Sequence, residues 1–461
     1  MITLPDAGLF RAYDLRGIAY ETLHPHDMET ICHAFASAVI DASGTSHPAI
    51  VLVRDGRLSS PVLAQAATAG LRRAGACVID AGIGPSPYAY FTAQHVHAHG
   101  CIMITGSHNP PTHNGMKCML MGRPFFGEAL LALRARLAKN DVHHGAGTLE
   151  YCDYRETYAH ALLKELASIR LDFPVIWDAG NGAAGDIITM LTPHIQATSH
   201  MHLYCDIDGN FPNHHPDPSD VHTLENLQAM VLQNSGAVGL AFDGDGDRLG
   251  VVDEKGRIIS PDHLLMLLAR DVLQSTPYAT ILADVKTSDA FFADVRTRGG
   301  HAVMAQTGHA LIKERMRETS AAFAGEASGH LFFADRYFGF DDGLYAAIRI
   351  LSLRARAGKP LSDLIDALPV LHTSAEMRIP CDDDQKFAVV TRIAEALIAQ
   401  GATVNTLDGV RVSSADGWWL LRASNTQAAL VARAEGNSET ALAKQMQALW
   451  EVLAHAGLPA P

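Results

Sequence analysis

The chain has 461 residues, 48% of them hydrophobic, and it carries a formal net charge of −14 at pH 7. This length exceeds what one hydrophobic core usually supports and predicts roughly three to four domains, while the acidic balance argues against broad binding to nucleic acid or anionic membranes. The seven cysteines form no C-x-x-C pair, the N-terminus lacks a signal-peptide pattern and no apolar run is as long as a membrane span, so we expect a soluble cytoplasmic protein.

Three successive parts of the chain alternate strand-like and helix-like segments. The first, residues 49–104, holds short apolar runs around a helix predicted at 60–75, which begins near a proline and ends at a glycine. The same alternation returns over residues 173–242 and again over residues 279–320. Strands that alternate with helices indicate α/β units built on parallel strands.

The C-terminal part has a different pattern. A helix predicted at 386–401 precedes several strand-like runs between residues 404 and 435 that have no helices between them. A final helix carries Leu442, Met446, Leu449 and Leu453 on one face. This pattern predicts a smaller α+β domain. The resulting domain boundaries divide the chain into residues 1–150, 151–253, 254–368 and 369–461.

The stretch ITGSHNPPTHNG, residues 104–115, places Ser107 in a stiff loop directly after a buried strand. It is not a nucleophile elbow, because Thr105 and Asn109 stand where that motif needs glycines. The chain also has no Walker A loop, since its one Gly-Lys pair, at 358–359, lacks the required upstream glycine. Glycine, serine, asparagine and proline are ordinary turn residues, so this stretch alone leaves a plain turn and a functional loop open.

The stretch FDGDGDRLG, residues 242–250, alternates Asp243, Asp245 and Asp247 with glycines. Three carboxylates this close repel one another unless a cation neutralises them, and hard oxygen ligands suit Mg²⁺. An EF-hand is excluded because Arg248 occupies the position where that loop needs glycine. The alternative is a solvated hairpin turn, but the arginine directly after the carboxylates favours a metal site.

Two further patterns suggest other ligands. GNGAAG, residues 180–185, follows a strand and has Asp206 about twenty residues on, as a dinucleotide-binding loop would. That interpretation explains neither the serine loop nor the aspartate loop. The histidines around residues 200–215 suggest zinc, but the proline-rich stretch 208–218 is better interpreted as a loop that positions its neighbours.

Two polar stretches resemble ligand loops. AGEASGH, residues 324–330, places Glu326, Ser328 and His330 at alternate positions, which is suitable for reading hydroxyl groups. RASNTQ, residues 422–427, places Arg422 beside hydroxyl and amide donors, which is suitable for a phosphate. The alternatives are a polar strand end for the first stretch and an ordinary turn between strands for the second.

Together these stretches resemble a known family. TGSHNP, DGDGDR, GEASGH and RASNT occur in the order, and at roughly the separations, found in the α-D-phosphohexomutases, and FRAYDLRG (10–17) and DGNFPNHHPDP (208–218) also match. The chain resembles this family from about residue 10 to its C-terminus, and most of all the bacterial phosphomannomutase/phosphoglucomutase subgroup. The resemblance implies three related α/β domains with mixed sheets and a smaller α+β C-terminal domain around a central cleft.

The resemblance also implies a role for each motif. Ser107 would be a phosphoserine in the resting enzyme. The metal ligands would be Ser107, Asp243, Asp245 and Asp247, with Mg²⁺ as the cofactor. The catalytic residues would be Ser107, His108, Lys117, Arg248, His309 and His330. The substrate-binding residues would be Tyr13, Arg16, Lys286, Gly308, Glu326, Ser328, Arg422, Ser424, Asn425 and Thr426.

The implied reaction moves a phosphoryl group between the 1- and 6-positions of mannose and glucose phosphates through a hexose 1,6-bisphosphate, which also serves as activator. The implied partners are hexose phosphates, with no nucleic acid and no membrane, and the implied enzyme is a monomer. Phosphoglucosamine mutase remains an alternative within the family. A nicotinamide-dependent dehydrogenase, a serine-phosphate hydrolase and a non-catalytic sugar-phosphate-binding protein remain alternatives from other classes.

Overall fold

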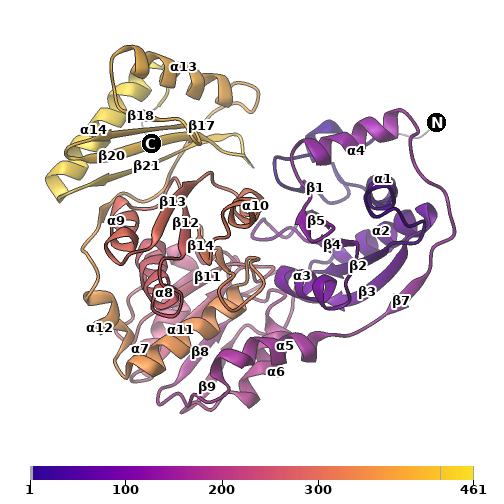
Figure 1. The fold of residues 1–461 in the computed structure, drawn as a ribbon, viewed down its shortest axis with the longest axis horizontal. Coiled ribbons are helices and arrows are strands. Elements are labelled where there is room, and N and C mark those ends of the chain that lie inside the picture. The colour runs from indigo at the N-terminus through magenta and orange to yellow at the C-terminus, as the bar shows by residue number, and fades with distance from the viewer. Residues whose placement is uncertain (1–3, 426, 460–461) are drawn as a thin grey trace.

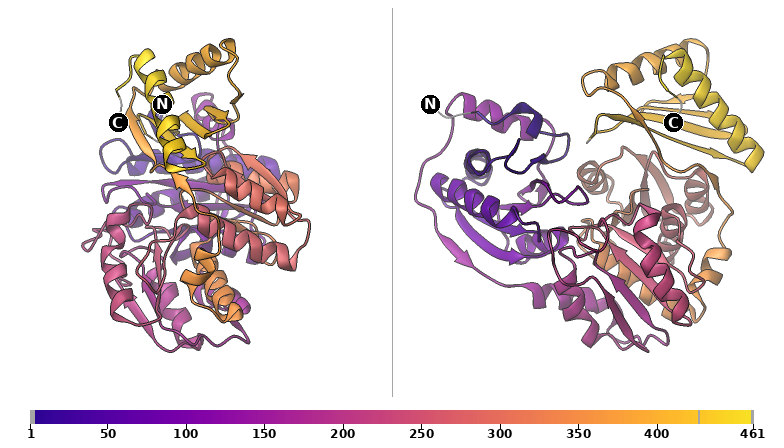
Figure 2. Two further views of the ribbon diagram at one scale, coloured as in Figure 1. Left: turned by 90° about the vertical axis from the view of Figure 1, so that its left-hand side faces the viewer. Right: turned by 180° about the vertical axis from the view of Figure 1, so that it is seen from behind.

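The computed structural model describes residues 4–425 and 427–459. Four β-sheets, each with its own helices, follow one another along the chain (Figure 1). The first three units lie along an arc, and the fourth stands over the third, across from the first (Figure 2). Of the helices in the described residues, none is both long and apolar enough to cross a bilayer.

The first sheet has seven strands, in the order β1-β5-β4-β2-β3-β7, with β6 beside β5. These strands are β1 (Leu15–Ile18), β2 (Ala49–Arg54), β3 (Cys77–Ile83), β4 (Gly100–Ile104), β5 (His113–Leu120), β6 (Arg123–Pro124) and β7 (Leu149–Tyr151). Its helices are η1 (Ala7–Leu9), α1 (Pro25–Ser43), α2 (Ser60–Ala74), α3 (Ser86–His95) and α4 (Glu128–Ala138). Ile50 and Leu52 pack into the core with α1 and α2, whereas Val51 and Val53 pack with α3 on the other face. Because both faces of β2 are covered, its sequence is a continuous run of apolar residues.

The second and third sheets have four strands each, in the orders β11-β10-β8-β9 and β13-β12-β14-β15. The second unit contains α5 (Arg155–Leu163), η2 (Lys164–Leu166), β8 (Val175–Asp178), α6 (Gly185–Leu191), η3 (Thr192–His194), β9 (His200–Leu203), η4 (Val221–Leu224), α7 (Glu225–Gln233), β10 (Val238–Phe242) and β11 (Leu249–Val252). The third contains α8 (Pro261–Ser275), β12 (Thr280–Asp284), α9 (Asp289–Thr297), β13 (His301–Ala305), α10 (His309–Thr319), β14 (Phe323–Gly325), β15 (Leu331–Phe333), α11 (Gly343–Ala357) and α12 (Leu361–Asp366).

The first three sheets share one topology. In each, three neighbouring strands are parallel, and a fourth strand returns antiparallel beside the last of them. The parallel strands follow the predicted strand–helix alternation. The returning strand is antiparallel because a short loop, not a helix, connects it to its predecessor. The three returning loops are residues 105–112, 243–248 and 326–330, so the serine, aspartate and glutamate motifs occupy equivalent positions in three units.

The fourth sheet is antiparallel throughout and has the order β16-β21-β20-β19-β18, with β17 also beside β21. Its strands are β16 (His372–Thr373), β17 (Met377–Pro380), β18 (Val404–Asn405), β19 (Val410–Ser414), β20 (Gly417–Ala423) and β21 (Ala429–Gly436). The helices α13 (Lys386–Ala399) and α14 (Glu439–His455) pack on it around a core of its own. This unit is the predicted α+β domain.

One continuous core joins the first three units. It includes Tyr88 of α3, Trp177 of β8, Leu265 of α8 and Leu344 of α11, and all four side chains are buried. Polar bonds add to this joint, because the hydroxyl of Tyr158 in the second unit donates to Asp342 in the third at 2.8 Å, and the hydroxyl of Tyr345 in the third donates to Glu165 in the second at 2.9 Å. The shared core therefore fixes the three returning loops relative to one another.

Candidate active site

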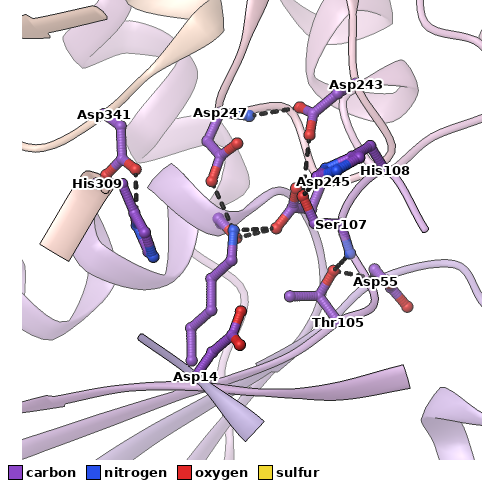
Figure 3. Close-up of polar contacts among 12 residues, drawn as sticks. Asp14, Asp55, Thr105, Ser107, His108, Asp243, Asp245, Asp247, His309 and Asp341 are labelled. Carbon is purple, nitrogen blue, oxygen red and sulfur yellow. Dashed lines mark hydrogen bonds and ion pairs between the residues drawn. The ribbon is translucent and has the colours of Figure 1, made fainter. Parts of the chain in front are cut away.

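The three returning loops meet at one place. The amide of Leu249, directly after the aspartate loop, donates to the carbonyl of Gly329 in the glutamate loop at 3.1 Å. Gly244 approaches the serine loop so closely that a Cβ there would lie 2.4 Å from the Ser107 carbonyl oxygen. In Figure 3, Ser107 and His108 lie beside Asp243 and Asp245. The equivalent loops of three units thus build a single site.

Ser107 is held in a defined orientation. Its φ of 50° lies in the left-handed region, which few non-glycine residues adopt, and its side chain is buried. Its amide donates to Thr105 Oγ1 at 2.8 Å, and its Oγ lies 3.2 Å from both Asp243 Oδ2 and His108 Nδ1. The predicted nucleophile therefore faces a carboxylate and an imidazole.

The three aspartates form a buried acidic cluster in which one ligand oxygen from each lies within 4.8 Å of the others. Asp243 Oδ1 accepts the amides of Asp247 and Arg248 at 3.0 and 3.1 Å. Burial, and then the charges of Asp247 and Asp245, raise the pKa of Asp243 well above its usual value. The cluster thus holds more negative charge than its surroundings neutralise.

Lys117 supplies part of the missing positive charge. Its Nζ donates to Asp245 Oδ2 at 2.7 Å and to Asp247 Oδ2 at 2.6 Å. Asp245 Oδ1 is nevertheless buried without a hydrogen-bond donor among the residues that the structure describes, which is unusual for a carboxylate oxygen. Converging carboxylate oxygens with such an orphaned atom fit a hard divalent cation.

Glu326 and His330 form a charged pair beside this cluster. His330 Nδ1 lies 2.9 Å from Glu326 Oε2, and its Nε2 lies 3.2 Å from Asp247 Oδ1. Burial alone would lower the pKa of His330, but the Asp247 carboxylate and Glu326 together raise it to about 9. Burial likewise opposes ionisation of Glu326, and His330 and Lys286 still hold its pKa at about 2. The pair is therefore ionised at neutral pH, with the imidazolium facing the acidic cluster.

The pKa values of the other two site histidines are lowered, in contrast to that of His330. Burial, followed by the nearby Arg248 and Arg16 cations, lowers the pKa of His108 well below its usual value. Burial and the charge of Lys313 lower the pKa of His309, although its Nδ1 lies 3.1 Å from Asp341 Oδ2. Both imidazoles are therefore neutral at pH 7.

Residues of the predicted phosphate-binding group lie together across from the serine loop. Arg422 Nε donates to Asp408 Oδ2 at 2.9 Å, and its buried Nη2 meets no acceptor among the described residues. Tyr13 Oη donates to the Thr307 carbonyl at 2.6 Å and is bonded by the amide of Asn425. These contacts join the first, third and fourth units around Arg422.

Close approach requires glycine at position 308. Its φ is 135°, and a Cβ there would lie 2.4 Å from the Tyr13 ring. The Gly308 amide donates to Glu326 Oε1 at 2.6 Å, so this position connects Tyr13 with the glutamate loop.

The remaining predicted residues lie around the same region. Arg248 Nη1 lies 3.7 Å from Asp217 Oδ1, Lys286 Nζ donates to Glu376 Oε2 at 3.0 Å, Arg16 Nε donates to Asp14 Oδ2 at 2.8 Å, and Ser328 Oγ lies 3.0 Å from His330 Nδ1. Ser424 Oγ accepts the Gln427 amide at 3.2 Å. Thr426 lies outside the described residues.

The glycine-rich turn at 180–185 packs on the aspartate loop. The Gly182 amide donates to Ala179 and the Ala183 amide donates to Gly244, at 2.7 and 3.0 Å. A dinucleotide-binding turn needs such amides for the pyrophosphate. Their engagement with protein carbonyls disfavours nicotinamide binding. His200 and His202 bond to separate groups, Trp177 and Thr192, and do not converge on one ion.

The sequence-based prediction missed three buried residues of this site. Ser86 Oγ donates to Asp245 Oδ2 at 2.5 Å from the start of α3. Asp55 and Arg57 bond to the serine loop from the end of β2. A signal was present, because RDGR (54–57) follows an apolar strand, as the serine loop does. Adjacent parallel strands bring their carboxyl ends to the same edge of a sheet.

Comparisons with known proteins agree with this geometry. The phosphoglucomutase/phosphomannomutase models for α/β/α domains I, II and III match residues 7–143, 150–256 and 260–371, and the C-terminal domain model matches residues 376–452. The phosphomannomutase/phosphoglucomutase of Pseudomonas aeruginosa is 42% identical over 440 residues, which cover 95% of this chain and 94% of that protein.

A phosphoglucomutase of Neisseria gonorrhoeae is 40% identical over 443 residues and covers 94% of each chain. The crystal structure of a phosphoglucomutase/phosphomannomutase family protein from Burkholderia thailandensis matches with a TM-score of 0.90 and 39% identity, over 100% of both chains. The predicted resemblance and fold class are thereby confirmed. The chain belongs to the phosphoglucomutase/phosphomannomutase family of hexose phosphate mutases.

Proposed function

We propose that this enzyme interconverts the 1- and 6-phosphates of mannose and of glucose through a phosphoserine at Ser107 and a hexose 1,6-bisphosphate. One observation carries the proposal: Ser107 Oγ is held 3.2 Å from Asp243, in a cluster of three buried aspartates, with Lys117 and His330 on the same cluster. Phosphoryl transfer depends mainly on positioning and on charge stabilisation, and this arrangement supplies both.

The chemistry of the acidic cluster suits Mg²⁺. Asp243, Asp245 and Asp247 would hold the ion together with an oxygen of the phosphorylated Ser107, and the bound ion would neutralise charge on the phosphoryl group. The protein contributes further positive charge from Lys117, Arg248 and the His330 imidazolium. These groups are preorganised, so they need little rearrangement as charge develops.

The proton at Ser107 Oγ has a nearby partner. His108 Nδ1 lies 3.2 Å from that oxygen, and burial keeps the imidazole neutral. His108 is thus placed to accept the serine proton when Oγ takes a phosphoryl group, and to return it in the reverse step. His309 and Lys117 are the other predicted proton-transfer or phosphate-binding groups of the site.

The substrate would be held at its non-reacting end. Arg422, with Ser424, Asn425 and Thr426, would bind the phosphate that is not being transferred, and the buried Nη2 of Arg422 supplies a donor for it. Glu326 and Ser328 would contact sugar hydroxyls. Since every residue in this account comes from one chain, we propose that the monomer is active.

A panel of substrates tests the proposal. Purified enzyme with Mg²⁺ and a trace of glucose 1,6-bisphosphate should convert mannose 1-phosphate and glucose 1-phosphate to their 6-phosphates, with kcat/KM values that differ less than about a thousandfold. A larger difference in kcat/KM would show that the enzyme contacts the 2-hydroxyl and distinguishes the two sugars there. Preferential turnover of glucosamine 1-phosphate would favour the other family member, and no turnover of any sugar would refute the mutase function.

A further inference from the structure

The buried side chain of Arg57 spans the serine loop. Its guanidinium donates to three backbone carbonyls of that loop and to one at the start of β5: Ser107 at 2.7 Å, Asn109 at 2.6 Å, Pro110 at 2.5 Å and His113 at 3.0 Å. The fifth N–H, on Nε, donates to Asp55 Oδ2 at 3.1 Å. A guanidinium has five N–H donors in a rigid plane, so every one of them is engaged.

This complete engagement distinguishes Arg57 from Arg422. Arg422 has a buried donor available for a ligand, whereas Arg57 has none left for a phosphate. The Arg57 side chain is also fully buried, so substrate does not reach it. A role for Arg57 in the reaction must therefore act through the loop that it binds.

Asp55 binds the part of the serine loop that precedes Ser107. Its Oδ2 accepts Thr105 Oγ1 at 2.8 Å and the Gly106 amide at 3.2 Å, and its Oδ1 accepts Ser60 Oγ at 2.5 Å. It also compensates the buried charge of Arg57, which would otherwise be costly. The residues on both sides of Ser107 are thus bound to one ion pair at the end of β2.

A loop of the second unit covers the same guanidinium. The ring centroid of Phe211 lies 5.1 Å from the Arg57 Cζ, within the range of a cation–π contact. Two glycines allow the approach: a Cβ on Gly209 would lie 2.6 Å from the Arg57 Cα, and one on Gly56 would lie 2.1 Å from the Ile207 side chain. Phe211 is buried at this joint and has a φ of 50°.

The loop that carries Phe211 also binds the aspartate loop. The Pro216 carbonyl accepts the Gly244 amide at 3.2 Å. The proline-rich stretch 208–218 therefore touches the serine loop through Arg57 at one end and the aspartate loop at the other. This arrangement gives a physical role to a motif that no catalytic step explains.

We infer that Asp55, Arg57 and Phe211 form an anchor that fixes Ser107 relative to Asp243, with Arg57 as a positioning residue for phosphoryl transfer. The anchor opposes relaxation of the left-handed backbone at Ser107 and holds the first unit in register with the second. The expected effect of the anchor on kcat rests on the proposed function. Its effect on the serine loop does not, because the order of the loop can be measured without turnover.

Arg57→Lys is the sharpest test, because it keeps the charge but cannot supply five planar donors. A displacement of about 1 Å at the reacting atoms can lower a rate about 100-fold, so we expect kcat to fall about 10- to 100-fold. The KM should change less than about threefold, because the phosphate-binding group around Arg422 is intact. Phe211→Leu keeps all five bonds and should lower kcat only severalfold. Arg73→Lys, at an exposed arginine of α2 that pairs with Glu29 of α1, is the control.

Hydrogen exchange of residues 105–113 provides a readout independent of turnover. We expect faster exchange in Arg57→Lys than in wild type and Arg73→Lys, with an unchanged rate in the fourth unit. If Arg57→Lys does not fold, Phe211→Leu carries both measurements. Wild-type kcat together with wild-type exchange in the serine loop would overturn the anchor. A wild-type enzyme without mutase activity, but with exchange that depends on Arg57, would refute the proposed function and leave the anchor standing.

Discussion

Asp245 has a buried carboxylate with one oxygen bound by Lys117 and Ser86 and the other without a donor among the described residues. This imbalance suits a ligand of a divalent cation better than a structural ion pair. Lys117 bonds to Asp245 and Asp247 together, so the lysine and a bound cation would share the neutralisation of the cluster.

We predict that Asp245→Asn lowers kcat about 100-fold or more, because it removes a charged ligand where phosphate charge must be stabilised. Steady-state kinetics at saturating Mg²⁺ would measure the loss, and Asp206→Asn, outside the cluster, is the matched control. Chelation should abolish wild-type activity and added Mg²⁺ should restore it. Full activity in thoroughly chelated enzyme would contradict the metal site.

Arg422→Ala should weaken binding of both the 1-phosphate and the 6-phosphate substrates, because each presents its phosphate to this position in turn. Loss of a charged hydrogen-bond partner is worth about 1.5–3 kcal/mol, so we expect KM to rise about 10- to 100-fold for both. Arg392→Ala, at an exposed arginine on α13 of the same unit, should leave KM unchanged. An effect confined to one substrate would mean that Arg422 does not hold the non-reacting phosphate.

The element that recurs in this molecule is the short loop after the third parallel strand. The serine, aspartate and glutamate motifs each occupy it, in three sheets of one topology. The sequence predicts the alternation of elements because buried parallel strands read as apolar runs. It does not predict that the three loops converge, since convergence depends on how the shared core packs the units together.

Gly244→Ala tests the contact between two of these loops. The new Cβ would lie 2.4 Å from the Ser107 carbonyl oxygen, a distance that forces one loop to move. We predict a fall in kcat of about tenfold or more with a melting temperature near that of wild type, because the strain falls on the two active-site loops and not on the apolar core. Unchanged kcat would show that the separation of the two loops is not critical.

The sequence predicted the residues that carry functional groups in the site more completely than the buried residues that hold them in place. Residues in motifs, such as Ser107, Asp243 and Arg422, carry functional groups in an unusual local pattern. Asp55, Arg57 and Ser86 act through contacts with distant residues, and short local signals cannot reveal those partners. The domain boundaries near residues 150, 253 and 368 stay predictions, as do the individual roles of the site residues.

At the scale of the whole molecule, the first three units share one core while the fourth has its own. A small apolar cluster of Val285, Trp418 and Leu420, together with the Arg433–Asp262 ion pair, connects the fourth unit to the third. A fourth unit with a core of its own suits the proposed phosphate-binding group, which would have to accept the substrate in two orientations.

Asp342 connects pH to the stability of the joined units. Its Oδ2 accepts the hydroxyls of Tyr158 in the second unit and Tyr337 in the third, at 2.8 Å each. Burial raises its pKa to about 7 from the usual 3.8. Between these values the folded protein keeps a proton that the unfolded chain has lost, so the stabilisation is complete below about pH 4 and is lost as the pH rises to about 7.

We predict that Asp342→Asn removes this dependence. The free energy of unfolding of the variant minus that of wild type should increase from pH 4 to pH 7, by an amount on the order of a few kcal/mol. Urea denaturation across that range measures the difference. A difference that is constant with pH would show that Asp342 is ionised in the folded protein throughout.

The most direct test of the whole account is the location of the phosphate. The purified enzyme should be incubated with ¹⁸O-phosphate-labelled glucose 1,6-bisphosphate and Mg²⁺, digested, and mapped by peptide mass spectrometry before and after a chase with unlabelled glucose 1-phosphate. We predict that labelled phosphate is found on Ser107, is replaced there by unlabelled phosphate in the chase as the label passes to the sugar, and is absent from Ser107→Ala. Phosphate found consistently on Ser328 or Ser424 with Ser107 unmodified, or labelled phosphate on Ser107 that the chase does not exchange, would contradict the account.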